Sequence, residues 1–481
     1  MSAREVDVVV IGGGPAGEVC AGRLGQADLE VVLVERELVG GECSYWGCMP
    51  SKALLRPSEV LAEALRVPGA REAVRDELDS VAALRRRDEI IHDLDDTSQI
   101  PWLEARNVEL VRGTATLDGP DRVRVNGDTL TARRAVVIAT GTTAAVPPIP
   151  GLNEVAPWTN REATTAQRVP ATLIVLGGGV IGVELAQAWT SLGAHVTLLE
   201  ALPRVLAREE PFASELVEKA LRDRGVDLRV GARVVLAHKA HSRVWVTLSD
   251  GEELAAEELL VAAGRRPQTG TLGLETVGLE PGVPITVGDD MRVPGSDWLY
   301  AVGDVNGRAL LTHIGKYQAR IAAEQILGRD ARAQPLADGA LVPRVVFTDP
   351  QVAAVGHTTE SALESGLRIR TVDHETSATA GASFHARNTP GISRIIVDED
   401  RDVLVGATFT GTDVAEWLHA ATIAIVGEVP VEQLWHAVPS FPTRSEVWLR
   451  LLEKLEDDRR TVAGMPATSK STSARGGIRK R

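Results

Sequence analysis

Two cysteines five residues apart, Cys43 and Cys48, are the residues of this sequence best suited to chemistry. No further pair of Cys or His residues follows at the spacing of a zinc site, which disfavours a metal fragment. In an ideal helix their Cα atoms would lie about 8–9 Å apart, too far for a disulfide bond. Gly47 and Pro50 permit an irregular backbone here. The pair is therefore either redox-active or two unrelated buried thiols.

Two segments repeat one pattern that is typical of phosphate binding. In each, an apolar strand runs into G-x-G-x-x-G, a helical stretch follows, and a second apolar strand ends in Glu. The glycines allow the backbone to approach a pyrophosphate, the helix N-terminus faces its charge, and the acid accepts from a ribose hydroxyl. The sequence thus predicts two dinucleotide sites, one formed by Gly12, Gly14, Gly17 and Glu35 and the other by Gly177, Gly179, Gly182 and Glu200.

The composition is typical of a soluble globular protein with several domains. The 481 residues are 44% hydrophobic and 25% charged, and the net charge of -14 argues against a dedicated nucleic-acid binder. No apolar stretch has the length of a membrane span. A strand pattern that begins at Val6 leaves no room for a secretory signal, and three cysteines are too few for a disulfide-built secreted fold. We expect a cytoplasmic protein. The third cysteine, Cys20, is expected to be a small core residue on the helix that follows the first glycine loop.

Further along the chain, short motifs appear in a characteristic order. Buried strands run into glycine turns at residues 135–141 and 259–264. The ordered motifs are Cys-x4-Cys-x-Pro-x-Lys at 43–52, Ala139-Thr140-Gly141, Gly264-Arg265-Arg266-Pro267, Tyr300-Ala301-Val302-Gly303-Asp304 and the segment 342–350. Together with the two nucleotide patterns, they resemble the class I flavoprotein disulfide reductases, or pyridine nucleotide-disulfide oxidoreductases, over about residues 5 to 455. This family includes dihydrolipoamide dehydrogenase, glutathione reductase, mycothione reductase and mercuric reductase.

The resemblance implies an α/β fold with two Rossmann-like nucleotide-binding domains, for FAD and NAD, and an α+β C-terminal dimerisation domain. The expected FAD-binding domain comprises residues 1–152 and a second, central segment, 276–335, which flank an NAD-binding domain at 153–275. The dimerisation domain is expected at 336–460. Residues 461–481 carry five basic residues and no acid, and we expect a disordered basic tail. The implied assembly is a homodimer.

The resemblance also assigns roles to individual residues. Cys48 would be the thiolate next to the flavin and Cys43 the interchange thiol that meets the substrate. Lys52 would lie near flavin N5 and pair with Glu184 on the second nucleotide-binding helix, since a buried lysine needs an acid. The implied cofactor contacts outside the second glycine loop are Gly12, Gly14, Gly17, Glu35, Gly41, Lys52, Thr140, Gly141, Gly264, Gly303, Asp304 and the helix that starts around His313. No metal ligand is predicted.

The second nucleotide site is expected to prefer NADH over NADPH. Glu200 favours a ribose 2′-hydroxyl and repels a 2′-phosphate. Family members that use NADPH carry two arginines just after this strand, where this chain has Ala201 and Ala207. Arg204 and Arg208 are nearby but offset.

The chain departs from the family near its C-terminus. The family's last motif, His-Pro-Thr-x-x-Glu, supplies a proton-carrying histidine from the partner subunit and a glutamate that orients it. Here Phe441 occupies the histidine position and Glu446 remains, either as a catalytic residue or as part of a capping box with Thr443. His436, five residues upstream, either reaches the site or is an unrelated loop histidine.

The cysteine loop also differs from the family. Tyr45 and Trp46 replace smaller or polar residues between the cysteines, either to stack an aromatic acceptor or to fill a gap.

The resulting hypothesis is a flavin-dependent NAD(P)H oxidoreductase. Electrons would pass from NADH through FAD and the Cys43–Cys48 disulfide to a disulfide or quinone-like acceptor. Three alternatives remain open at this stage. They are dihydrolipoamide dehydrogenase, an enzyme similar to 2-ketopropyl-coenzyme M reductase/carboxylase, which also lacks the histidine, and a flavin-bound redox sensor without efficient turnover.

Overall fold

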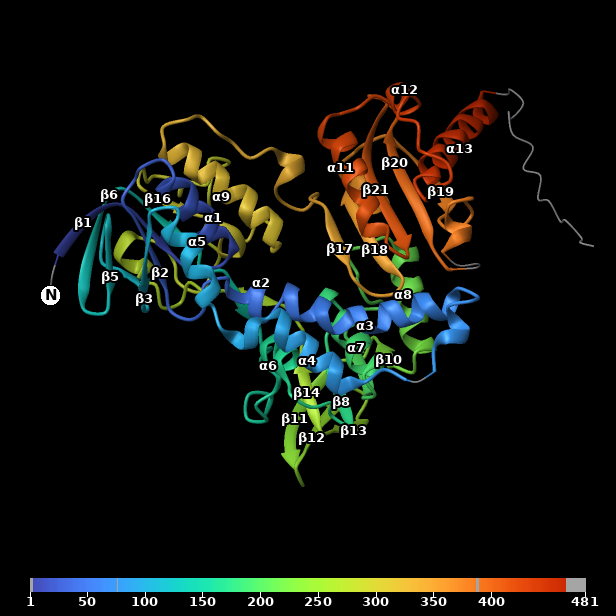
Figure 1. Cartoon of the computed structure of the whole chain (residues 1–481), viewed down its shortest axis with the longest axis horizontal. Coiled ribbons are helices and arrows are strands. Elements are labelled where there is room, and N and C mark those ends of the chain that lie inside the picture. Colours follow the sequence, from blue (N-terminus) through green and yellow to red (C-terminus); the bar gives the residue numbers. More distant parts are fainter. Residues whose placement is uncertain (1–2, 76, 386–388, 464–481) are drawn as a thin grey trace, which may run out of the picture.

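The first sheet contains seven strands and is built around the apolar run that opens the sequence. In the computed structural model, which describes residues 3–75, 77–385 and 389–463, its order is β3-β2-β1-β6-β5-β4, with β16 beside β6 (Figure 1). Its central strands pair in parallel and are buried on both faces, as their continuous apolar sequence predicts. The strands are β1 (Ala3–Ile11), β2 (Val31–Glu35), β3 (Val108–Arg112), β4 (Thr116–Leu117), β5 (Arg122–Val125), β6 (Asp128–Ile138) and β16 (Leu299–Ala301).

Two helices, α1 (Pro15–Gly25) and α9 (Thr312–Ile326), pack against each other on this sheet although about 300 residues separate them in the sequence. Small residues allow the close approach, because a Cβ added to Gly315 would lie 3.3 Å from the Ala16 Cβ. The N-termini of both helices therefore face the same end of the sheet. The short helices α2 (Gly41–Tyr45) and α5 (Ile100–Glu104) complete this part of the chain, whereas α4 (Ser80–Ile90) packs on α3 (Cys48–Arg66) and contributes Ala83 and Leu84 to the interior around the second sheet.

A second parallel sheet has the order β10-β9-β8-β14 and an attached antiparallel sheet, β11-β12-β13. The fully buried Trp189 lies in its core. Its strands are β8 (Thr172–Leu176), β9 (His195–Glu200), β10 (Asp227–Val230), β11 (Val234–Ala240), β12 (Arg243–Leu248), β13 (Glu253–Ala256) and β14 (Glu258–Val261). Its helices are α6 (Asn160–Thr165), α7 (Val180–Ser191) and α8 (Pro211–Asp223), and the strands β7 (Thr142–Ala144) and β15 (Arg265–Pro267) link it to the first sheet.

The C-terminal part is an antiparallel sheet with the order β17-β18-β21-β20-β19. Its strands are β17 (Arg344–Val346), β18 (Gln351–Gly356), β19 (Ile369–Glu375), β20 (Ile392–Asp398) and β21 (Val403–Gly411). Its helices are α10 (Thr359–Glu364), α11 (Leu418–Val426), α12 (Val431–Leu434) and α13 (Glu446–Val462). α13 extends two residues into the range that we assigned to the tail, and residues 464–481 lie outside the described ones.

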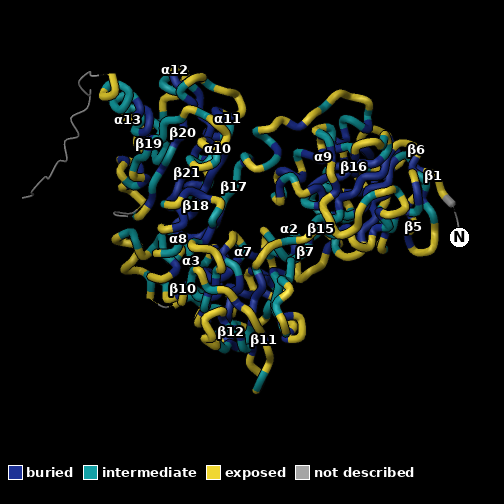
Figure 2. The backbone as a smooth tube through the Cα atoms, turned by 180° about the vertical axis from the view of Figure 1, so that it is seen from behind, coloured by how far each residue is buried: buried dark blue, intermediate teal, exposed yellow. Residues whose placement is uncertain are grey.

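One long helix, α3 (Cys48–Arg66), connects these three parts. It starts at the cysteine loop, packs on α4 and α7, and reaches the start of the C-terminal sheet at its far end (Figure 1). Each part has its own buried interior, shown in dark blue in Figure 2. The two parallel sheets and the α+β unit confirm the predicted fold class. Within the described residues, no helix combines the length and apolar character that crossing a membrane requires.

Candidate active site

The first glycine loop has the geometry that a dinucleotide pyrophosphate needs. A Cβ on Gly12 would lie 2.5 Å from the Ala139 carbonyl oxygen, and one on Gly17 would lie 1.8 Å from the Gly12 carbonyl oxygen. Gly14, the N-cap of α1, faces open space, and no described side chain caps the helix. The first N–H groups of α1 thus remain available to an anion. The Glu35 carboxylate at the end of β2 accepts from the N–H groups of Gly13 and Glu37, each at 2.6 Å.

The second glycine loop repeats this arrangement at α7. A Cβ on Gly182 would lie 1.8 Å from the Gly177 carbonyl oxygen, and Gly179 at the N-cap faces open space. The Glu200 carboxylate accepts from Gly178 N at 2.6 Å and Leu202 N at 2.7 Å. Arg204 donates to the carbonyl oxygens of Glu209 and Ala207, so its guanidinium is already engaged inside its own loop. Both sets of residues fit the nucleotide cofactors that the sequence predicts.

The two cysteines lie on either side of a break between two helices. Cys43 is in α2, Cys48 is the first residue of α3, and Gly47 between them has a non-helical backbone, as expected. Both are free thiols in the structure. Cys48 Sγ lies 3.7 Å from Thr312 Oγ1 at the N-terminus of α9. The helix dipole of α9 therefore favours a negative charge on Cys48.

The two thiols differ strongly in acidity. The hydrogen bond from the Cys43 thiol, assisted by Thr312 and the Lys52 ammonium, lowers the pKa of Cys48 to about 6, although burial opposes this shift. The same hydrogen bond together with burial raises the pKa of Cys43 well above the usual range of a thiol. One member of the pair is thus a thiolate at neutral pH and the other a thiol. Cys20 is fully buried, and burial raises its pKa to about 12, in line with a core position.

Lys52 forms the expected ion pair with Glu184. The Lys52 Nζ lies 2.7 Å from Glu184 Oε2, one turn of α3 beyond Cys48. The Glu184 side chain on α7 is only 3% exposed, so the pair is held between two helices from different parts of the chain. A buried carboxylate of this kind requires a cationic or N–H partner for each oxygen.

One face of the Trp46 ring is already occupied by a cation. The Arg161 guanidinium lies over its ring, 4.0 Å from the centroid, and the Trp46 carbonyl oxygen accepts from Asn160 Nδ2 at 2.8 Å. Tyr45 is 1% exposed and fills the interior. The structure therefore favours the gap-filling alternative for the buried Tyr45, whereas the partly buried Trp46 keeps both alternatives.

A polar network connects the cysteine loop to Asp304. Glu42 accepts from Arg161 Nε at 2.5 Å and from Arg265 Nη2 at 3.3 Å. Arg265 donates in turn to Thr142 Oγ1 at 2.7 Å, and that hydroxyl donates to the Asp304 carboxylate at 2.8 Å. Burial raises the pKa of Asp304. The sequence assigned Asp304 to the cofactor and did not identify Thr142 or Arg161 as its neighbours in this network.

The remaining predicted cofactor contacts lie along the same sheet end. Gly41 approaches the first glycine loop, with an added Cβ 2.9 Å from the Gly14 Cα. Thr140 Oγ1 donates to the Gln268 carbonyl oxygen at 2.9 Å, and the Gly141 carbonyl oxygen accepts from Gln268 N. Gly303 begins a short turn below α9, and Gly264 precedes β15. The His313 side chain donates to the Pro343 carbonyl oxygen at 2.8 Å, so its ring is engaged away from the site. The N-terminus of α9, on which His313 lies, remains available to a cofactor.

Glu446 is placed differently from the capping box that the sequence suggested. It is the first residue of α13, and its carboxylate accepts from Gly381 N at 3.2 Å and lies 3.7 Å from Arg450 Nη2. Thr443 Oγ1 instead donates to the Ser440 carbonyl oxygen. The capping-box alternative is wrong because α13 starts two residues later than that motif requires, with Ser445 and not Thr443 at the N-cap position. Phe441 is 75% exposed, and His436 is exposed on the same segment.

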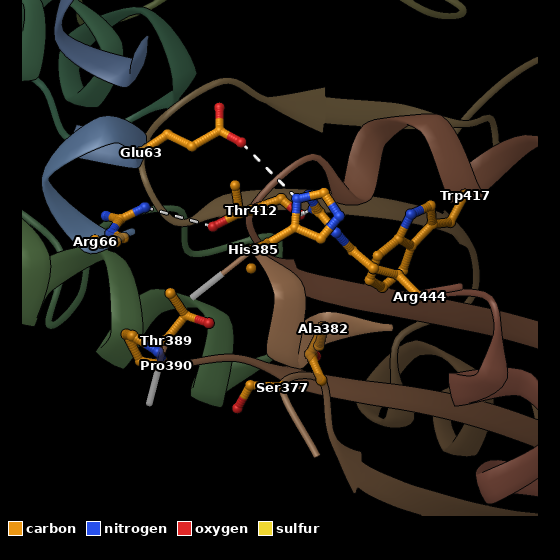
Figure 3. A pocket seen from close by; sticks show the side chains of 12 residues that line it. Glu63, Arg66, Ser377, Ala382, His385, Thr389, Pro390, Thr412, Trp417 and Arg444 are labelled. Carbon is orange, nitrogen blue, oxygen red and sulfur yellow. Dashed lines mark hydrogen bonds and ion pairs between the residues drawn. The ribbon is translucent and has the colours of Figure 1, made fainter. Parts of the chain in front are cut away.

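A separate pocket lies at the far end of α3 (Figure 3). Its walls include Glu63, Arg66, His385 and Arg444. His385 Nδ1 accepts from the Arg444 guanidinium and lies 3.8 Å from Glu63 Oε1, and Arg66 pairs with Asp349. These charges satisfy one another, and no thiol lines the pocket. It is distinct from the cysteine site at the start of the same helix.

Comparison with known proteins identifies the relatives of this chain. Residues 6–324 match the family described as pyridine nucleotide-disulphide oxidoreductase, and residues 342–451 match the dimerisation domain of that family. The chain is 35% identical to dihydrolipoyl dehydrogenase 3 of Pseudomonas aeruginosa, over 92% of this chain and 96% of that protein. It is 30% identical to a mercuric reductase of Lysinibacillus sphaericus, over 92% of this chain and 81% of that protein.

Solved structures show the same similarity. The Cu(II) complex of the HOCl-induced flavoprotein disulfide reductase RclA from Escherichia coli has a TM-score of 0.82 at 27% identity, and the match covers 93% of this chain and 99% of that one. LpdA from Mycobacterium tuberculosis has a TM-score of 0.82 at 25% identity, with 94% and 100% of the two chains covered.

Proposed function

Because this chain belongs to the pyridine nucleotide-disulphide oxidoreductases, enzymes that use FAD and a pyridine nucleotide, we propose that it oxidises NADH and reduces a disulfide-type acceptor through Cys43 and Cys48. The observation that carries the proposal is the position of Cys48 at the N-terminus of α9, 3.7 Å from Thr312 Oγ1, which makes its thiol more acidic than that of Cys43. A thiolate at Cys48 and a thiol at Cys43 are the states that a redox-active pair needs when one sulfur exchanges with substrate and the other closes the disulfide.

The chain's own residues account for the acceptor half of the reaction. The Cys43 sulfur, on losing its proton, attacks one sulfur of the acceptor disulfide, forms a mixed disulfide and releases the first acceptor thiol. The Cys48 thiolate then attacks the Cys43 sulfur, which forms the Cys43–Cys48 bond and releases the second acceptor thiol. Two electrons leave the dithiol, and the two acceptor sulfurs take up two protons. FAD, when bound, supplies the two-electron transfer from NADH that reopens this bond.

Lys52 and the N-terminus of α9 support this chemistry electrostatically. The ammonium and the helix dipole both stabilise negative charge at Cys48. Glu184 holds the Lys52 ammonium in place through the 2.7 Å ion pair. By the same logic, Glu35 and Glu200 would orient the ribose hydroxyls of FAD and NADH at the two glycine loops.

We also propose that NADH is preferred over NADPH. Two observations support this preference: Glu200 ends β9 beside the second glycine loop, where its negative charge would repel a 2′-phosphate, and Arg204 is already engaged in its own loop. The test is the ratio of kcat/KM for the two cofactors with one acceptor. We expect NADH to be favoured at least tenfold, and Glu200→Gln to narrow the ratio. A preference for NADPH would contradict the assignment.

Anaerobic titration of the purified flavoprotein with NADH tests the main proposal. A long-wavelength absorption band at two electrons per flavin is expected in the wild type and absent in Cys48→Ser. Steady-state reduction of a disulfide panel, including lipoamide, is expected to be lost in both Cys43→Ser and Cys48→Ser. Flavin bleaching without the band, with turnover retained in Cys43→Ser, would show that the cysteines are bypassed.

A quinone-like acceptor reduced directly at the flavin is the second candidate. Phe441 occupies the position of the family's histidine and is exposed, and its ring cannot donate or accept a proton. Reduction of a quinone involves no thiol leaving group that must be protonated. The replacement of the histidine by Phe441 would therefore slow quinone reduction less than disulfide reduction. Quinone reduction that persists in Cys43→Ser while disulfide reduction is lost would favour this candidate.

The proposed assembly is a cytoplasmic homodimer. The dimerisation-domain match at residues 342–451 and the exposed apolar side chains of Val438 and Phe441 support a second copy at the C-terminal part. Sedimentation of the purified protein at micromolar concentration tests it, and a monomer under these conditions would contradict it.

A further inference from the structure

Lys52 contacts more than its acid partner. Its Nζ lies 2.7 Å from Glu184 Oε2 and 4.7 Å from the centroid of the Phe347 ring. The side chain of Lys52 is 33% exposed, so it is partly shielded on the side of this ring. A lysine side chain has four rotatable bonds, and an ion pair at one point leaves the ammonium free to pivot. A second contact restricts that motion.

Phe347 contacts both members of the ion pair. Its ring lies under the Lys52 ammonium, and its backbone N–H donates to Glu184 Oε1 at 2.9 Å. Glu184 therefore uses one carboxylate oxygen for Lys52 and the other for Phe347. The ring face carries the negative part of its quadrupole, which attracts the ammonium in the same direction as the carboxylate does.

The segment that carries Phe347 is itself fixed on α7. Asp349 N donates to Gln187 Oε1 at 2.8 Å, one turn of α7 after Glu184. The Asp349 carboxylate, 6% exposed, pairs with Arg66 of α3 and Arg224 of α8. The Phe347 ring is thus held against the helix that begins with Cys48 by contacts to three helices.

We propose that Phe347 is a positioning residue that holds the Lys52 ammonium beside the Cys48 thiol. This inference deepens the proposed function and rests on it, because it assumes that the Cys48 thiolate takes part in the reaction. The C-terminal part of the chain then contributes to the redox site of its own subunit, through one ring and one backbone N–H from the segment that follows β17.

The test measures the ionisation of Cys48 in a background where it is the accessible thiol. In Cys43→Ser, Cys20 is fully buried and does not compete. The rate of iodoacetamide alkylation and the long-wavelength flavin absorbance are followed against pH in the holoenzyme. Phe347→Leu removes the ring but keeps the N–H bond to Glu184. We expect its alkylation rate at pH 6 to fall about threefold, with the midpoint of both titrations moved to higher pH.

Matched variants separate positioning from a general loss of structure. Phe347→Tyr keeps a ring face and is expected to restore the midpoint, whereas Phe347→Met, a ring-free side chain of similar size, is expected to repeat the shift. Phe212→Leu is the control, because the Phe212 ring lies 4.8 Å from the Arg394 guanidinium and so pairs with a different cation. It is expected to leave the midpoint unchanged.

The outcomes distinguish this inference from the proposed function. Equal midpoints in Phe347→Leu and Phe212→Leu, or a shift of the same size in Phe347→Tyr, would overturn the role of the ring. Absence of both the long-wavelength band and low-pH alkylation in Cys43→Ser itself would instead refute the proposed thiolate and leave the inference without its basis.

Discussion

At the scale of single residues, the site depends on a division of charge between two sulfurs. Cys48 lies where an ammonium, a hydroxyl and a helix N-terminus converge, while Cys43 faces the resulting thiolate. The same helix that begins with one of these sulfurs carries Lys52 one turn later, on the same face. Sequence spacing along α3 therefore sets the electrostatics of the pair.

The acidity of Cys48 gives a prediction with a definite sign. Its lowered pKa of about 6 means that the thiolate is favoured above that pH and is lost as the pH falls through it. Lys52→Met removes a cation that lowers this pKa, so the alkylation midpoint of Cys48 in the Cys43→Ser background is expected to rise toward the ordinary value of about 8.5. Lys219→Met, on a surface pair of α8, is the control and is expected to have no effect. An unchanged midpoint in Lys52→Met would contradict the electrostatic account.

At the scale of elements, the cysteine loop is held by α6 and not by its own hydrogen bonds alone. Arg161 lies on the Trp46 ring and also binds Glu42, the residue before Cys43. Asn160 and Thr164 of the same short helix donate to the Trp46 carbonyl oxygen. Trp46 thus connects the thiol pair to the part of the chain that contains the second sheet and the second glycine loop.

Removal of this contact is expected to loosen the cysteine loop. Trp46→Val leaves Arg161 without its ring. Arg161→Gln leaves Glu42 with its contacts to Asn160 and Arg265 only. Each is expected to slow disulfide reduction about tenfold while the melting temperature changes little, because the loop moves and the cores do not. The double variant is expected to be no slower than the worse single variant, since both act on one contact. Additive losses would show that the two residues act separately.

The first turn of α13 gives a second prediction at this scale. Glu446 accepts from the Gly381 N–H in a buried position, and glycine is required there because an added Cβ would lie 2.1 Å from the Thr443 carbonyl carbon. Glu446→Gln retains an accepting oxygen and is expected to melt within a few degrees of the wild type. Glu446→Leu leaves the N–H unpaired and is expected to cost about 1–3 kcal/mol of unfolding free energy. Equal stability of the two variants, measured by denaturant unfolding, would argue against this structural role.

At the scale of the whole molecule, the sequence predicts local patterns better than contacts between distant segments. The glycine loops and the cysteine pair follow from motifs with fixed spacing, and the Lys52–Glu184 pair follows from the family resemblance. The contacts of Phe347 and Arg161 leave no local signal, because they depend on how α3, α6 and α7 pack. The capping-box prediction for Glu446 failed for a related reason, since tertiary contacts to Gly381 decide where α13 starts.

We therefore expect Asp349 to contribute to the unfolding free energy through the junction of the three parts. Its buried carboxylate pairs with Arg66 and Arg224, from α3 and α8, in a segment that leads into the C-terminal sheet. Asp349→Asn removes the charge that both guanidinium groups share. Since each arginine remains about a quarter exposed, we expect a loss of about 1–3 kcal/mol, less than for a fully buried pair. The loss should appear in denaturant unfolding and should be smaller in 1 M NaCl, where screening already weakens the pairs.

Removal of the arginines tests whether this junction also orders the redox site. The double variant Arg66→Leu/Arg224→Leu leaves Asp349 as an unpaired buried carboxylate, whereas the triple variant with Asp349→Leu removes every charge. We expect the double variant to be the least stable of the set and the triple variant to recover part of the loss. If Asp349 anchors the segment of Phe347, the Cys48 alkylation midpoint must also rise in the double variant. If the double variant loses stability but the Cys48 alkylation midpoint does not change, the Asp349 pairs stabilise the junction of the three parts without positioning the Cys48 thiolate.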